Sequence, residues 1–179
     1  MSKLKELTWE NHQKAERTEH ARKLLKGMTP EEYHRYLYNQ YVQYAALETI
    51  ASGEGVLEGI EHIARASSIL ADIIELETEY NISRDIELLC PVVAQYVQHV
   101  MGLDDKDDIL AHIYVRHFGD MYGGQMIKKR NPGSGKMYEF ENVDQLKTTV
   151  RAMLNDDMAE EANRCFEFAM QLFEELDRE

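Results

Sequence analysis

Apolar residues recur every three to four positions along most of this 179-residue chain, and runs that alternate strictly between apolar and polar residues are almost absent. A repeat of that length is typical of α-helices that bury one face. Thr29-Pro30-Glu31-Glu32 marks a helix start, because it combines a capping threonine, proline at the first helical position and glutamate at the third. The first half of the chain predicts helices over residues 3–16, 18–27, 30–52 and 61–80.

The second half of the chain continues with the same period. Pro91 suits the first turn of a helix, and the acidic stretch 104–108 suits a helix N-terminus, where negative charge complements the dipole. Residues 131–136 (NPGSGK) form the clearest loop. Because no internal repeat or linker divides the sequence, we expect one all-α domain over residues 1–179. Its later helices are expected over residues 92–101, 104–129, 143–155 and 158–176.

Composition narrows the class of protein. Apolar residues make up 44% of the chain, which argues against disorder, and a net charge of −13 argues against general attraction to nucleic acid. Apolar runs span only a few residues, and the first ten residues lack the apolar core of a signal peptide. Cys90 and Cys165 form no CxxC pair. We therefore expect a soluble cytoplasmic protein, and apolar patterns confined to helix faces are compatible with a monomer.

Three glycines interrupt the predicted helix over residues 104–129. Gly119, Gly123 and Gly124 each cost about 1 kcal/mol relative to alanine in a helix interior. Gly119 and Gly123 are four residues apart, so they share one face and leave a groove without side chains. On spacing alone, close packing against another helix is the favoured explanation. Approach of a ligand to the bare backbone is the alternative.

Two histidine patterns could hold a metal. Glu16 follows His12 by one helical turn, and a metal-binding histidine commonly has its second ring nitrogen oriented by a carboxylate. Seven histidines are present, so this pair alone is a weak signal. Glu31 and His34 supply one Glu-x-x-His spacing, whereas a carboxylate-bridged di-iron bundle needs two copies and two more glutamates.

Cationic and aromatic pairs near the C-terminus have ordinary explanations as well as functional ones. Lys147 and Arg151 are four residues apart and could be a solvated face or a site for a dianionic ligand. Phe166 and Phe173 share one helix face, as core residues usually do. The basic cluster Lys128, Lys129 and Arg130 stands out in an acidic chain and would attract an acidic partner.

Together these segments resemble the haem oxygenase family. AHIYVRHFGDMYGGQMIKK at 111–129 is similar to the family's distal-helix signature, in which a tyrosine and an arginine precede GD-x-x-GGQ. LKELTWENHQKAE at 4–16 is similar to the segment that carries the proximal histidine, and QYVQYAALE at 40–48 and QLFEEL at 171–176 fit the same order. The resemblance covers nearly the whole chain and is loosest between residues 53 and 86. It implies a single helical bundle with haem between the first helix and a kinked glycine-rich distal helix.

The resemblance also implies residue roles. His12 would be the axial ligand of the haem iron, with Glu16 bonding its other ring nitrogen. Asp120 would hold a water network that delivers protons on the distal side, where oxygen binds. The remaining distal residues would be Gly119, Gly123, Gly124, Arg116 and Tyr44. Lys5, Tyr114, Lys147 and Arg151 would engage or flank the propionates, and Phe166 and Phe173 would pack on the macrocycle.

The activity implied by the resemblance is cleavage of haem b to biliverdin, most often the IXα isomer, with release of carbon monoxide and ferrous iron. This reaction needs O2 and a reductant. The resemblance implies that the reductant is ferredoxin, an acidic protein, which would dock near Lys128, Lys129 and Arg130. A bilin reductase would be a downstream partner. Ala169 and residues 151–155 (RAMLN) depart from some family members, which affects the propionate contacts. Two alternatives remain: a haem-binding or haem-storage protein of the same fold, and a non-haem di-iron bundle enzyme. We assign the thiol of the Cys90-Pro91 dipeptide no role.

Overall fold

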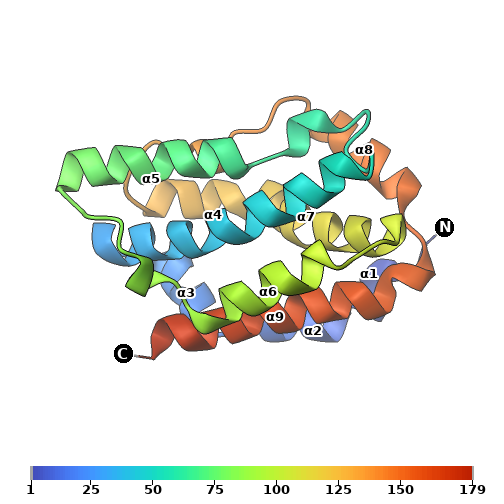
Figure 1. Cartoon of the computed structure of the whole chain (residues 1–179), viewed down its shortest axis with the longest axis horizontal. Coiled ribbons are helices and arrows are strands. Elements are labelled where there is room, and N and C mark those ends of the chain that lie inside the picture. Colours follow the sequence, from blue (N-terminus) through green and yellow to red (C-terminus); the bar gives the residue numbers. More distant parts are fainter. Residues whose placement is uncertain (1, 179) are drawn as a thin grey trace.

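The computed structural model describes residues 2–178, and every regular element among them is helical (Figure 1). This confirms the expected all-α fold. The helices are α1 (Leu4–Leu7), α2 (Trp9–Glu16), α3 (Glu19–Lys26), α4 (Pro30–Gly53), α5 (Ala66–Tyr80), α6 (Pro91–Met101), α7 (Lys106–Arg130), α8 (Val143–Met153) and α9 (Ala159–Asp177). Short 3-10 turns lie at η1 (Glu61–Ile63), η2 (Ile86–Leu88), η3 (Lys136–Tyr138) and η4 (Asp156–Met158).

The two longest helices begin where their capping residues predict. At the start of α4, Thr29 Oγ1 accepts a hydrogen bond from the Glu32 amide at 3.2 Å, and Glu32 Oε1 accepts one from the Thr29 amide at 3.1 Å. This reciprocal capping box satisfies two backbone donors that the helix itself leaves unpaired. At the start of α7, the Asp105 carboxylate accepts from the Asp107 amide at 2.8 Å.

Two expected helices are divided in the structure. Residues 3–16 form α1 and α2, separated at Thr8, whose hydroxyl donates to the Leu4 carbonyl at 2.8 Å. Residues 61–80 form η1 and α5, because the Glu48 carboxylate takes the amides of Arg65 and Ala66, at 2.6 and 2.9 Å, and sets a new helix start. A third difference is smaller, since α8 ends at Met153 rather than at residue 155.

The core is organised around α4, α7 and α9. α4 packs against α5, α6 and α7, while α9 packs against α2, α3, α6 and α7 (Figure 1). One buried cluster includes Ile109 and Ile113 of α7, and a second includes Leu37 of α4 and Ile73 of α5; Phe168 of α9 contacts both. Each fully buried aliphatic side chain contributes about 1.5–3 kcal/mol, so these clusters fix α7 against its neighbours. None of the helices described here is both long and apolar enough to cross a bilayer.

Candidate haem site

The three glycines of α7 have different surroundings. A Cβ atom built on Gly119 or Gly123 would find no heavy atom within 4 Å, so this face of the helix is open. A Cβ on Gly124 would lie 2.3 Å from Cδ1 of the buried Tyr138 ring. Gly124, which the resemblance places among the haem-binding residues, therefore packs against Tyr138 instead. Gly119 and Gly123, for which spacing alone favours helix packing, form a bare face that a ligand could approach.

Asp120 lies between these glycines and points into the bundle. Its side chain is buried, and Tyr44 donates a hydrogen bond to Oδ2 at 2.5 Å. Burial raises the pKa of the Asp120 carboxyl to about 6, although His117, the Tyr44 hydroxyl and Arg116 all act in the opposite direction. A carboxyl with this pKa can both hold and release a proton near neutral pH.

Arg116 lies one turn before Asp120 and is held on three sides. Its Nε donates to the Tyr96 hydroxyl at 2.9 Å, and its terminal nitrogens donate to Gln40 Oε1 at 3.2 Å and Gln43 Oε1 at 2.7 Å. The guanidinium also lies 4.2 Å from the Tyr96 ring centroid. Three hydrogen bonds and a cation–π contact compensate for burying this charge. Arg116 thus belongs to a buried polar network that joins α7 to α4 and α6.

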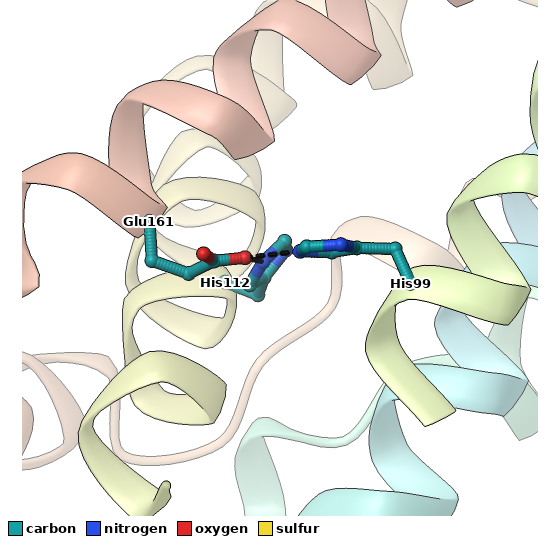
Figure 2. A group of neighbouring side chains, drawn as sticks. All are labelled: His99, His112 and Glu161. Atoms are coloured by element: carbon teal, nitrogen blue, oxygen red, sulfur yellow. Dashed lines mark hydrogen bonds and ion pairs between the residues drawn. The ribbon is translucent and has the colours of Figure 1, made fainter. Parts of the chain in front are cut away.

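The buried polar network extends further along α7. The Tyr96 hydroxyl lies 2.8 Å from Nδ1 of His112, and Nε2 of His112 lies 2.7 Å from Oε1 of Glu161. His99 bonds the same carboxylate oxygen, as Figure 2 shows. Tyr96, His99, His112 and Glu161 were not among the candidates predicted from the sequence. A signal was present, because residues 112, 116 and 120 are each four apart and share one helix face.

His12 lies beside Glu16, the carboxylate expected to bond one of its ring nitrogens. Its Nε2 lies 2.9 Å from Oε1 of Glu16, which leaves Nδ1 available. The ring stacks on Phe166 of α9 at 5.8 Å between centroids, and the edge of Trp9 packs at 5.2 Å. The structure therefore brings together His12, Glu16 and Phe166.

Phe173 and Lys5 lie at the margins of this arrangement. Phe173 stacks on His20 at 5.0 Å, two helical turns beyond Phe166, so its contact with a macrocycle stays a prediction. Lys5 Nζ lies 5.9 Å from the centroid of the Trp9 ring, and the Trp9 ring contacts His12.

The other propionate candidates gather beside α7. The rings of Tyr114, Phe118 and Tyr122 follow one another along this helix, at 5.3 and 6.0 Å between centroids. Lys147 Nζ lies 3.8 Å from the Tyr122 ring, and the Arg151 guanidinium lies 5.7 Å from both Phe118 and Tyr122. Burial raises the pKa of Tyr114, while the Arg151 charge opposes this shift. A pair of cations thus lies beside α7.

Large apolar side chains are exposed on both sides of the expected ligand. Leu7 and Trp9, near His12, are 50% and 42% exposed, and Tyr122 and Met126, near the glycine face, are 57% and 51% exposed. Helix α2 carries His12 and helix α7 carries Gly119 and Gly123. Both helices pack against α9, so α9 holds them in place relative to each other.

The Glu-x-x-His pair does not form a metal site. Glu31 is exposed in the first turn of α4, whereas His34 is fully buried and bonds Oε2 of Glu77 at 3.1 Å. Because the two side chains lie in different environments, this spacing gives no support to the di-iron alternative.

Comparison with known proteins identifies one family. The model of the Heme oxygenase family matches residues 1–175. "Heme oxygenase 2" of Macaca fascicularis is 32% identical over 98% of this chain, which spans 64% of that relative's length; "Heme oxygenase 1" of Synechocystis is 29% identical, with 98% and 84% covered. Among solved structures, the Synechocystis heme oxygenase-1 in complex with heme superposes with a TM-score of 0.79 at 25% identity, covering 97% of this chain and 90% of that one. The heme oxygenase of Leptospira interrogans shares the fold, with a TM-score of 0.80, 24% identity, and 95% and 96% covered.

The fold is an all-helical bundle with one long glycine-bearing helix, α7. The chain belongs to the haem oxygenase family. The resemblance inferred from the first helix and the glycine helix is therefore confirmed.

Proposed function

We propose that this protein is an enzyme that opens haem b to biliverdin, with release of carbon monoxide and ferrous iron, using O2 and electrons from a reductant protein. One observation carries the proposal: the open face at Gly119 and Gly123 and the buried carboxyl of Asp120 lie on the same turn of α7. A protein that only stored haem would gain nothing from burying this acid, because burial of a carboxyl is costly. Family membership and the haem complex of the Synechocystis relative support the same substrate.

The residues present fit haem as the substrate. His12 would bind the iron through the nitrogen that Glu16 leaves free, with Phe166 and Phe173 against the macrocycle. Gly119 and Gly123 would lie over the opposite face, where any side chain would crowd the oxygen site. Lys147 and Arg151, with Lys5 and Tyr114 nearby, would pair with or flank the propionates. This last contact would determine which edge of the ring faces α7, and hence the IXα isomer.

Bound haem supplies the iron at which oxygen is activated and the ring that is opened. The chain supplies orientation and protons. Asp120 would hold water above the glycine face and exchange protons with it, since the pKa of its carboxyl is about 6. The Tyr44 hydroxyl would hold the Asp120 carboxyl in place through its hydrogen bond. The guanidinium of the buried Arg116 lies 5.5 Å from the Tyr44 ring and would help to position that ring.

Spectroscopy tests the proposed reaction directly. The purified chain is mixed with one equivalent of haemin, and a reductant is added in air with catalase present to remove free peroxide. We expect the Soret band to decay while a red biliverdin band rises. A stable ferrous–oxy spectrum under several reductants, ferredoxin included, would instead identify a haem carrier. If haemin gives no Soret band of a protein complex, the proposal that this chain binds haem is wrong.

Replacing Asp120 tests the assignment of the proton network. We expect Asp120→Ala to bind haem as tightly as the parent, because it touches neither His12 nor the propionate cations. Biliverdin yield should fall at least tenfold, because general acid–base catalysis typically contributes 10²–10⁴-fold to the rate of the step it assists. Quantifying biliverdin by absorbance after one turnover makes the comparison. A normal yield would remove Asp120 from the mechanism.

A further inference from the structure

Three potential metal ligands from three helices converge at the far end of the buried polar network. They are His99 of α6, His112 of α7 and Glu161 of α9, and one ligand atom from each lies within 4.8 Å of the others. Figure 2 shows both imidazoles directed at the same carboxylate. His112 Nε2 lies 2.7 Å from Glu161 Oε1, and His99 Nε2 is hydrogen-bonded to that same oxygen.

We propose that His99, His112 and Glu161 form a binding site for a single divalent transition-metal ion such as zinc. Two imidazoles and one carboxylate are a known zinc-binding set that leaves a fourth position open. Ligand atoms at about 2.0–2.1 Å from a tetrahedral ion are about 3.3 Å apart. The 2.7 Å separation of His112 and Glu161 therefore needs to widen by only about 0.6 Å, which small side-chain rotations can supply.

His112 is already oriented as metal-binding histidines usually are. Its second nitrogen, Nδ1, lies 2.8 Å from the Tyr96 hydroxyl, which in turn accepts a hydrogen bond from Arg116 Nε at 2.9 Å. Such a partner on the second nitrogen fixes the ring and its tautomer. When Nε2 binds an ion, Nδ1–H donates to the Tyr96 oxygen, and the Tyr96 hydroxyl proton can turn to the adjacent Cys165 sulfur.

Burial and charge around the cluster suit a cation with access from one side. His112 is fully buried and Glu161 is 8% exposed, but His99 is 21% exposed and provides an entry path. Asp108, one turn before His112, adds a second negative charge close to the site. Arg164 opposes a cation, with NH1 3.7 Å from Glu161 Oε2, yet its side chain is 45% exposed and can turn to solvent.

This site is distinct from the haem site and from a di-iron centre. His112 precedes Gly119 by seven residues, which is about 10 Å of helix rise. A di-iron centre needs four carboxylates, whereas Glu161 is the only carboxylate among the three converging groups. The competing explanation is that Glu161 merely accepts two hydrogen bonds and joins three helices.

Zinc titration of the full chain separates metal binding from hydrogen bonding. The parent in this experiment is the His12→Ala variant, which lacks the histidine that would otherwise bind metal on the haem side. Each further variant adds one substitution to this parent. His99→Gln keeps an N–H donor for Glu161 but is a poor zinc ligand, and Glu161→Gln removes the charge. His62→Gln is the matched control, because His62 is exposed and pairs with Glu141 elsewhere.

We expect calorimetry to give one zinc ion per chain, with the affinity at least tenfold weaker in His99→Gln and Glu161→Gln and unchanged in His62→Gln. Zinc should also raise the unfolding temperature of the parent and of His62→Gln only, and cobalt should give visible bands of a four- or five-coordinate ion. Circular dichroism checks that each variant is folded; if Glu161→Gln is not, His99→Gln decides alone. Absence of one-to-one binding, or equal affinity in His99→Gln, would overturn the proposal.

Discussion

At the residue scale, the surroundings of each side chain decide its role more than its type does. Gly119 and Gly124 are both helical glycines, yet one faces open space and the other faces the Tyr138 ring. Asp120 is one of many acidic residues in the chain, but burial raises its pKa to about 6. Two predictions follow from these contrasts, one for each kind of residue.

Alanine substitutions at the glycines should have opposite effects on stability. In the haem-free protein, Gly119→Ala should stabilise the fold by up to about 1 kcal/mol, since helix propensity improves and nothing is displaced. Gly124→Ala should destabilise it by about 1–3 kcal/mol, because the new Cβ meets the Tyr138 ring. Urea unfolding compares them, and haem titration should show weaker binding for Gly119→Ala. Equal effects on stability at the two positions would contradict this assignment.

Asp120→Asn should stabilise the haem-free protein at neutral pH. A carboxyl with a folded pKa of about 6 binds more protons in the folded state than in the unfolded state, where its pKa is about 3.9. Stability is therefore lost as pH rises from about 4 to 6 and stays lower above that range. Asparagine can still accept the Tyr44 hydrogen bond without the charge. We expect a gain of about 1–3 kcal/mol at pH 7.5 and little at pH 4. Urea unfolding at both pH values tests this, and a pH-independent difference would contradict it.

At the scale of elements, buried polar side chains decide where helices begin and how they join. Glu48 of α4 accepts the amides of Arg65 and Ala66 and also bonds Nε2 of His117 at 2.8 Å. One carboxylate thus links α4, the start of α5 and α7. This explains why the apolar pattern over 61–80 is divided into two elements.

Glu48→Gln should lower the free energy of unfolding, although glutamine has nearly the same shape as glutamate. Oε2 of Glu48 accepts from both Arg65 and His117, so an amide nitrogen there would face two donors. An unsatisfied buried group costs about 1–3 kcal/mol, and we expect destabilisation of that size. Denaturant unfolding measures it, with Glu160→Gln as a control, because the Glu160 side chain is 88% exposed. Equal stability of Glu48→Gln and the parent would show that the junction is not held by this carboxylate.

At the scale of the whole molecule, charge distribution determines how a partner approaches. The net charge is −13, yet α7 ends in Lys128, Lys129 and Arg130. Lys128 is paired with Glu139 at 2.9 Å, while Lys129 and Arg130 are exposed. An acidic electron donor such as ferredoxin would therefore meet these last two cations first.

Charge reversal at this end of α7 tests the docking proposal. Lys129→Glu with Arg130→Glu should raise the KM for ferredoxin about five- to tenfold at low salt, and the difference should shrink at high salt through screening. Turnover driven by a small chemical reductant should not change. Lys106→Glu, about 35 Å away at the start of the same helix, is the matched control. An unchanged KM in the double variant would exclude this surface.

The sequence by itself determined the helical class, the two longest helices and the family. Local signals suffice there: the 3.6-residue period, the Thr29 capping box and the combination of His12 with the glycine-rich signature. It did not reveal which glycine faces open space, the breaks at Thr8 and Ala64–Arg65, or the cluster of His99, His112 and Glu161. These depend on side chains far apart in the chain that meet only after folding, such as Tyr138 against Gly124 and Glu48 against Arg65. Tertiary structure decided them because burial and long-range hydrogen bonds have no counterpart in the local pattern of residues.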